Sequence, residues 1–107
     1  MLFSNKIRNL REEKTMPQRH LADALGIDIP MYSRIERGER KAKREQIQIL
    51  ADVLETNAEE LLSLWLADQV NTIISIDKKV ATRVLELAKN TINIDTEIHY
   101  YAKRKAI

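Results

Sequence analysis

The chain has 107 residues, a net charge of +2 and no cysteine. This length allows one small domain with a short appended element, and the lack of cysteine excludes a disulfide framework and a thiolate metal site. The longest apolar run, from Leu61 to Leu66, is too short to cross a membrane, and no apolar segment follows the basic residues near the N-terminus, so we expect a cytoplasmic protein without a membrane partner.

The first two helices are marked by capping residues and helix breakers. The composition favours helices throughout, because the chain has only two glycines and two prolines. Ser4 is a suitable N-cap for a first helix that ends near Glu13. Pro17 suits the first position of a second helix, which ends at Gly26 because glycine readily takes the left-handed conformation that closes a helix.

A third helix is short and rich in arginine. Asp28 is a good N-cap, and Gly38 marks the end of a helix over about residues 29–37. From Arg34 to Arg44 the chain has six basic and two acidic residues, a net charge of +4. Such a local concentration of positive charge says more about nucleic-acid binding than the total charge does.

The rest of the chain also has helical periodicity. A fourth helix has apolar residues at helical spacing, namely Ile47, Leu50, Ala51 and Leu54. Asn57 caps a fifth helix that extends almost to Ile76, and Asp77 caps a sixth. Residues 95–107 form either one more short helix or a frayed end. We therefore predict an all-α fold.

The second and third helices, joined by a tight turn at Gly26, have the layout of a helix-turn-helix motif. The sequence resembles the phage repressor/Cro-like (XRE-type) helix-turn-helix family over about residues 4–63. The matching residues are Gln18, Leu21, Ala22, Leu25, Gly26, Ser33, Ile35, Glu36, Arg37, Gly38, Ile47, Leu50, Ala51, Leu54, Leu61 and Leu62. The resemblance implies a five-helix bundle that binds double-stranded DNA, here with one or two additional C-terminal helices.

The resemblance also implies roles for individual residues in DNA binding. With the third helix in the major groove, the residues that face the bases are Ile29, Pro30, Met31, Ser33 and Arg34. The residues expected on the DNA backbone are Gln18, Arg19, Arg37, Arg40, Lys41 and Lys43. Arg34 has the chemistry for two hydrogen bonds to guanine, and the loop cations would release counterions from phosphates. We expect Tyr32 and Ile35 in the core and a structural role for Glu36.

The apolar residues at the start of the third helix have three open interpretations. The family commonly has polar residues where this chain has Ile29, Pro30 and Met31. These side chains would contact thymine methyl groups, pack within the chain, or bind a partner protein.

Residues 64–107 are expected to form a dimerisation or partner-binding extension of a DNA-binding domain over residues 1–63. The fifth helix is apolar around much of its circumference, so it has more apolar surface than one core can cover. A homodimer would use this surface to place two recognition helices one DNA turn apart. The predicted dimer residues are Leu64, Trp65, Val70, Ile73 and Ile74.

The sequence thus predicts a sequence-specific transcriptional regulator, such as a small autoregulator or a restriction–modification controller. Two alternatives stay open: an antitoxin whose C-terminal helices bind a toxin, and a protein-interaction module that keeps the fold without binding DNA. We expect no enzymatic activity, because no nucleophile or acid–base arrangement is recognisable. We expect no cofactor and no metal, because His20 and His99 are isolated from other ligands.

Overall fold

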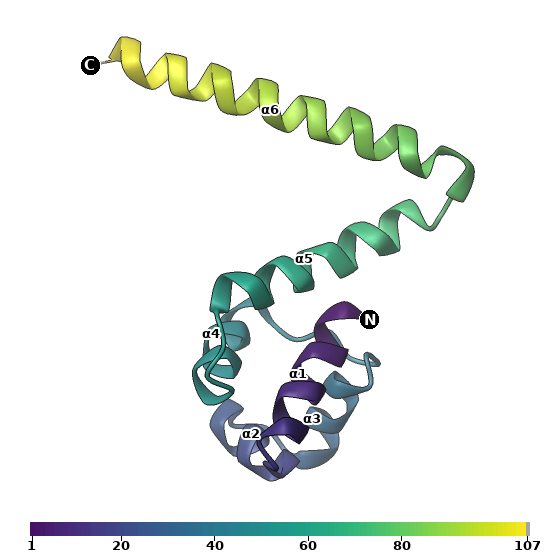
Figure 1. Cartoon of the computed structure of the whole chain (residues 1–107), viewed down its shortest axis with the longest axis vertical. Helices are drawn as coiled ribbons and strands as arrows, with labels where there is room; N and C mark the ends of the chain where they lie inside the picture. The colour runs from purple at the N-terminus through teal and green to yellow at the C-terminus, as the bar shows by residue number, and fades with distance from the viewer. Residues whose placement is uncertain (107) are drawn as a thin grey trace. The chain divides into compact units, whose positions relative to one another are not determined.

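The computed structural model describes the backbone of residues 1–106 and the side chains of residues 1–93. The described backbone is helical and has no strand, which confirms the all-α class (Figure 1). The elements are α1 (Leu2–Glu13), α2 (Gln18–Leu25), α3 (Ile29–Glu36), α4 (Arg44–Val53), α5 (Ala58–Ile74), a short 3-10 turn η1 (Lys78–Val80) and α6 (Ala81–Ala106). They form two compact units, Met1–Val70 and Asn71–Ile107.

The first unit is the predicted five-helix bundle, in which α2 packs against α3 and α4, and α1 packs against α3. Its core is continuous and draws residues from all five helices and from the loop before α4. The buried apolar residues are Phe3, Ile7, Leu21, Ala22, Tyr32, Ile35, Ala42, Ile47, Leu50, Ala51, Leu54 and Leu61. Most recur three or four positions apart within their helix, which is the spacing that keeps apolar side chains on one helical face.

The turn between α2 and α3 has the predicted chemistry. Gly26 ends α2 with φ of 67° and ψ of 32°, a left-handed conformation that costs other residues free energy. Asp28 caps α3, because its carboxylate accepts a hydrogen bond from the Met31 amide at 2.8 Å. These two residues set where α2 ends and where α3 begins.

The start of α1 differs from the prediction. The helix begins at Leu2 and Ser4 is a buried residue of its first turn, with its hydroxyl donating to the Met1 carbonyl. The reason is Asp68 in α5, whose two carboxylate oxygens accept from the amides of Leu2 at 2.9 Å and Phe3 at 3.0 Å. A carboxylate from a distant helix satisfies the amides that a local cap would otherwise satisfy, so the helix starts earlier than expected.

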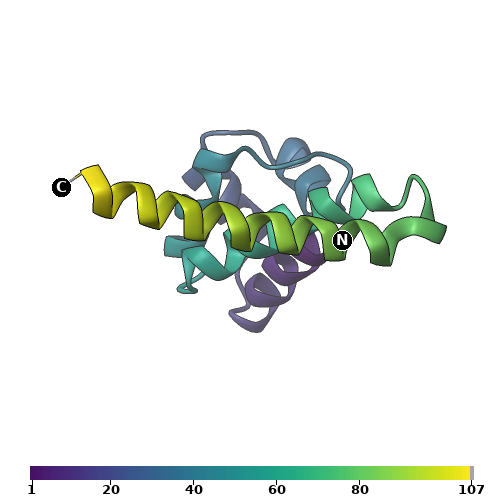
Figure 2. The same ribbon diagram turned by 90° about the horizontal axis from the view of Figure 1, so that it is seen from above.

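The second unit consists of the end of α5, the turn η1 and the long helix α6. α6 is a single uninterrupted helix from Ala81 to Ala106 (Figures 1 and 2), so the segment after residue 94 continues this helix and is no separate element. Asp77 caps η1, the turn that precedes α6, by accepting from the Lys79 amide at 3.1 Å. None of residues 71–93 is buried, and within the described chain no helix is long and apolar enough to cross a membrane.

Candidate nucleic-acid interface

α3 has one buried face and one face open to solvent. Tyr32, Ile35 and Glu36 are buried, which confirms Tyr32 and Ile35 as core residues. The predicted base-facing residues lie on the remaining surface: Ile29, Pro30 and Arg34 are exposed, and Met31 and Ser33 are half-buried. Ile29 retains 38% of its surface, so the apolar start of α3 is not absorbed into the core.

A buried ion pair fixes α3 to α1. Glu36, only 2% exposed, accepts two hydrogen bonds from the Arg11 guanidinium, Nε to Oε2 at 2.7 Å and Nη2 to Oε1 at 3.0 Å. Arg11 also donates to the Met16 carbonyl at 2.9 Å, and the Gln18 side-chain amide donates to Glu36 Oε1 at 3.3 Å. Two parallel bonds restrict orientation as well as distance, so α3 is held by α1 and by the start of α2.

The electrostatics of Glu36 follow from these contacts. Burial by itself raises the pKa of a carboxyl group. The hydrogen bonds from Arg11 and Gln18 outweigh burial and hold the pKa of Glu36 below its ordinary value. Burial beside this charge raises the pKa of Tyr32 far above its ordinary value. The Tyr32 hydroxyl is also the one buried side-chain polar atom without a hydrogen-bond partner among residues 1–93. The sequence predicts a structural role for Glu36, and the structure supplies its partner, Arg11.

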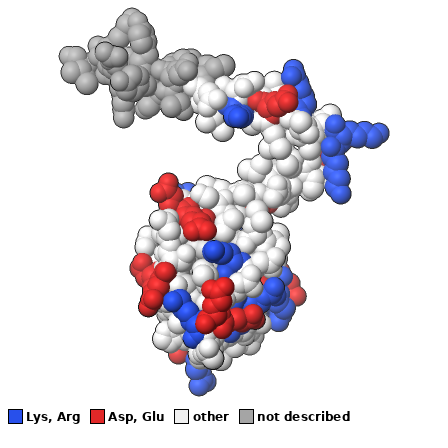
Figure 3. Space-filling view, viewed as in Figure 1, with Lys and Arg blue, Asp and Glu red and all other residues white. Residues whose placement is uncertain are grey.

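The predicted backbone-contacting cations lie at the start of α2 and in the segment that follows α3. The exposed ones are Arg19, in the first turn of α2, and Arg37, Arg40, Lys41 and Lys43, in the segment between α3 and α4. Arg37 pairs with Glu39 at 3.0 Å and donates to the Ser33 hydroxyl at 2.9 Å. Gln18 is half-buried, and its amide is engaged by Glu36 rather than turned wholly to solvent. On the face of the first unit seen in Figure 3, basic and acidic side chains are interspersed.

The basic segment also contacts α5, which the sequence did not indicate. The Trp65 indole Nε1 donates to the Ala42 carbonyl at 2.8 Å. The Lys41 ammonium donates to Gln69 Oε1 at 3.0 Å and lies 5.0 Å from the centroid of the Trp65 ring. At the end of the segment, the Lys43 amide donates to the Gln46 side chain, which supplies a cap for α4.

The predicted dimer residues have different surroundings. Leu64 and Trp65 are half-buried and pack against the core of their own unit. Val70 is 44% exposed and Ile73 64% exposed, while Ile74 is half-buried. Among the predicted dimer residues, the exposed ones therefore lie toward the end of α5.

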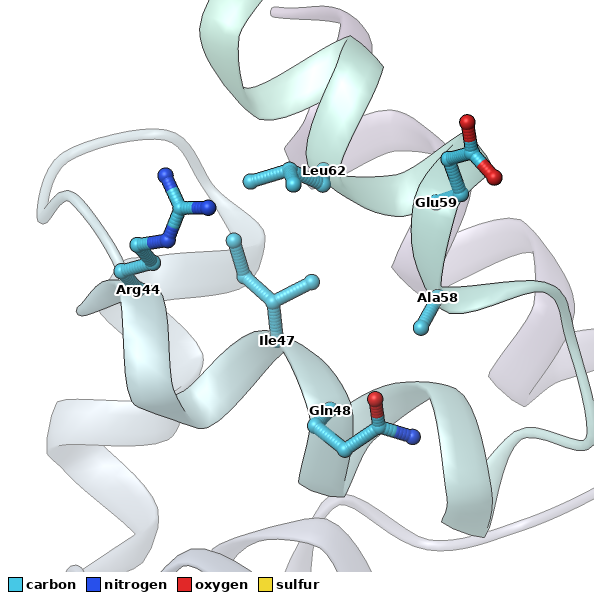
Figure 4. A pocket seen from close by; sticks show the side chains of 6 residues that line it. All are labelled: Arg44, Ile47, Gln48, Ala58, Glu59 and Leu62. Atoms are coloured by element: carbon cyan, nitrogen blue, oxygen red, sulfur yellow. The ribbon is translucent and has the colours of Figure 1, made fainter. Parts of the chain in front are cut away.

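A shallow hollow of about 340 Å³ lies between α4 and α5 (Figure 4). Its lining residues are Arg44, Ile47 and Gln48 from α4, and Ala58, Glu59 and Leu62 from α5. Arg44 and Glu59 are the charged side chains of this lining, and the others are apolar apart from the amide of Gln48. Among residues 1–93, no three His, Asp or Glu side chains are grouped as metal ligands.

This geometry agrees with comparisons to known proteins. Residues 7–61 match the family model described as Helix-turn-helix, which covers about half of the chain. The chain therefore belongs to the helix-turn-helix family, of the repressor-like XRE type predicted from its motifs. It is a DNA-binding transcriptional regulator, and its family is one of regulators rather than enzymes.

The individual relatives are regulators from bacteria. The chain is 29% identical over 80 residues to the cryptic phage CTXphi transcriptional repressor RstR of Vibrio cholerae serotype O1, a match that covers 75% of this chain and 71% of that protein. It is 40% identical over 60 residues to the uncharacterized HTH-type transcriptional regulator YazB of Bacillus subtilis, covering 56% of this chain and 87% of that protein. No solved structure matches the chain.

Proposed function

We propose that this chain is a sequence-specific repressor that binds double-stranded DNA as a homodimer, with α3 in the major groove. The observation that carries the proposal is the division of α3 into two faces. Its inner face is anchored in the core by Tyr32 and Ile35 and tied to α1 by the Glu36–Arg11 pair, so its outer face is presented rigidly. A rigid, exposed helix bordered by cations is what major-groove recognition requires.

Arg34 is the residue proposed to read a base by hydrogen bonding. It is exposed on α3, and a guanidinium can donate two hydrogen bonds to guanine O6 and N7. Ile29, Pro30 and Met31, at the start of α3, are proposed to contact thymine methyl groups. Ser33 lies between these groups, where its hydroxyl already accepts from Arg37.

The backbone contacts are assigned to the exposed cations beside α3 and to the start of α2. Gln18 and the backbone amides at the start of α2 are suited to hold a phosphate, because the N-terminus of a helix attracts anions. The proposed cationic contacts are Arg19, Arg37, Arg40, Lys41 and Lys43. Since each phosphate contact adds about 0.9 to the salt slope, five contacts would give a slope of about −4 to −5 per protomer.

Dimerisation is assigned to residues 64–107, with residues 1–63 as the DNA-binding domain. Val70 and Ile73 have exposed apolar surface near the end of α5, and Ile74, Leu64 and Trp65 complete the proposed interface. A two-fold operator needs two recognition helices about 34 Å apart, which a C-terminal interface can set.

The names of two relatives support the proposal of repression, and we propose autoregulation and a cytoplasmic location along with it. The Vibrio cholerae relative is a phage transcriptional repressor, and the Bacillus subtilis relative is an HTH-type transcriptional regulator. A small chain of this kind is suited to control its own operon or a restriction–modification operon, because occupancy of a promoter needs only DNA binding and dimerisation.

An antitoxin is the second candidate, favoured by the exposed apolar surface of the second unit. The large apolar residues there with more than two fifths of their surface exposed are Ile73, Ile76, Val80, Leu85, Leu87 and Ile92. Such a surface suits a protein partner as well as a second copy of this chain.

Salt-titrated fluorescence anisotropy with duplex DNA tests the proposal. We expect selected operator DNA to bind more tightly than duplex of mixed sequence, and affinity for both to fall steeply as salt rises. Arg34→Ala should remove most of the preference, about 1–3 kcal/mol, and leave affinity for mixed-sequence DNA nearly unchanged. Absent or salt-insensitive binding would overturn the proposal in favour of a protein-interaction module.

A further inference from the structure

Three residues of α5 contact the basic segment and the start of α1. Trp65, Asp68 and Gln69 are spaced three and four residues apart, so they lie on one face of the helix. All three follow residue 61, where the match to the family model ends. We call them the α5 clamp, and the segment 37–43 the basic loop. In Figure 1 this loop joins α3 to α4.

Trp65 fixes the basic loop near its C-terminal end. Its indole N–H donates to the carbonyl of Ala42, which is only 2% exposed and lies between two lysines. A buried carbonyl without a donor costs free energy, so this bond favours one loop conformation over the alternatives. Lys41 and Lys43 therefore leave the loop from a backbone that α5 holds in place.

Gln69 and the Trp65 ring hold the Lys41 side chain. The ammonium donates one hydrogen bond to Gln69 Oε1 at 3.0 Å and lies over the indole, 5.0 Å from its centroid. A lysine ammonium has three N–H donors, so two stay available for a phosphate oxygen. Neither Gln69 nor the indole carries a negative charge, so the lysine is oriented without being neutralised.

Asp68 holds the beginning of the loop through α1. Its carboxylate caps the first turn of α1 at the Leu2 and Phe3 amides. Gly38, with φ of 73°, lies so close to this turn that a Cβ there would be 3.1 Å from Met1 Cγ. The first turn of α1 therefore supports the start of the loop, and α5 supports that turn.

We propose that the α5 clamp positions the basic loop for the phosphates of DNA, with Trp65 and Gln69 orienting Lys41 before DNA arrives. The inference rests on the proposed function, because it requires the loop to contact phosphates. Orienting a flexible lysine beforehand removes part of the ordering cost of binding, so losing the clamp weakens binding even when every cation remains. The DNA-binding machinery then extends beyond the helix-turn-helix match to residue 69.

The test compares full-length variants by anisotropy against duplex DNA of mixed sequence. Gln69→Ala and Trp65→Phe each keep all cations. Under conditions where sedimentation velocity gives each variant the same oligomeric state as the parent, we expect binding roughly two- to tenfold weaker for each. Trp65→Phe keeps an aromatic ring and removes the donor to Ala42. The control for Gln69→Ala is Gln48→Ala, a glutamine whose amide donates to Asp52 in α4 and does not touch the loop; it should bind like the parent.

Lys41→Met measures the contact itself. It should lower the salt slope by about 0.9, the value of one phosphate contact, whereas Lys6→Met, which removes a cation paired with Glu60, should leave the slope unchanged. Trp65 is the chain's single tryptophan, so its emission reports on Lys41 directly. We expect unlabelled duplex to change this emission in the parent and not in Lys41→Met.

The outcomes separate the clamp from the proposed function. If the parent binds DNA but Gln69→Ala and Trp65→Phe bind equally well or more tightly, the clamp is overturned and the regulator stands. If a Trp65→Phe protein is misfolded by circular dichroism, Gln69→Ala and the emission response decide. If the parent does not bind DNA, the proposed function fails first.

Discussion

Residues 1–70 bury a continuous apolar core, whereas none of residues 71–93 is buried. In the first unit, two buried carboxylates accept hydrogen bonds from residues far away in the sequence: Glu36 from Arg11, and Asp68 from the amides at the start of α1. In the second unit, residues such as Ile73 and Ile76 expose 64% and 85% of their surface. The first unit therefore has its own buried core, whereas the second exposes large apolar side chains, for which we propose a partner chain.

The buried ion pair should give the largest effect on stability. Arg11→Met leaves Glu36 buried without its partner, and we expect a loss of about 3–5 kcal/mol in the free energy of unfolding. Urea denaturation followed by circular dichroism measures this loss. The matched control is Arg8→Met, since Arg8 makes only an exposed hydrogen bond to Asn5 and its removal should cost at most about 0.5 kcal/mol. Equal stabilities for the two variants would mean that the first unit does not depend on this pair.

A substitution in the second unit should weaken dimerisation and leave the free energy of unfolding of the first unit unchanged. Ile73→Asp places a charge in the proposed dimer interface, and we expect the dimer dissociation constant to rise roughly thirtyfold or more. Unfolding of the first unit should not change, because Ile73 is exposed and lies outside the core. Sedimentation velocity measures the association. Asn71→Asp adds the same charge two residues away at an exposed polar position, and a similar loss in that variant would show a general charge effect instead of an interface.

Acid should destabilise the first unit through Glu36. The pKa of this carboxyl is lowered in the folded state, so as the pH falls the unfolded chain takes up the proton first. The contribution is complete above the ordinary pKa of 4.5 and is lost as the pH falls through the lower folded value. Urea denaturation between pH 7 and pH 3 should show a smaller acid loss in Glu36→Gln than in the parent. Parallel curves for the two proteins would assign the acid sensitivity to other carboxylates.

Local sequence patterns predicted most of the first unit. Helical periodicity located the five helices to within a few residues, although the cap predicted for α1 was wrong. Gly26 and Asp28 set the central turn, and Tyr32 and Ile35 were identified as core. These features depend on neighbours within a few residues, which a single sequence displays directly.

Contacts between residues far apart in the sequence could not be predicted from local patterns. Arg11 and Glu36 are 25 residues apart, and Asp68 and Leu2 are 66 apart. Nothing in local spacing pairs such residues, although a carboxylate in an otherwise apolar stretch of α5 was a signal that Asp68 has a buried partner. The contact of Trp65 was also missed. Its apolar neighbours in the sequence suggested an interface, whereas its hydrogen bond to Ala42 depends on where α5 meets the basic loop.

The smallest expected effect on stability comes from removing an aspartate that caps a helix, and both units contain such an aspartate. Asp28 accepts from the Met31 amide at the start of α3, and Asp77 accepts from the Lys79 amide at the start of η1. Asp28→Ala should cost about 1 kcal/mol, because α3 unfolds together with the core of the first unit, and Asp28→Ser should restore most of it. Asp77→Ala should leave the same urea transition unchanged, because η1 has no buried residue through which its loss could reach that core. A comparable loss in both variants would show that the two units unfold as one, and that the second unit contributes to the stability of the first.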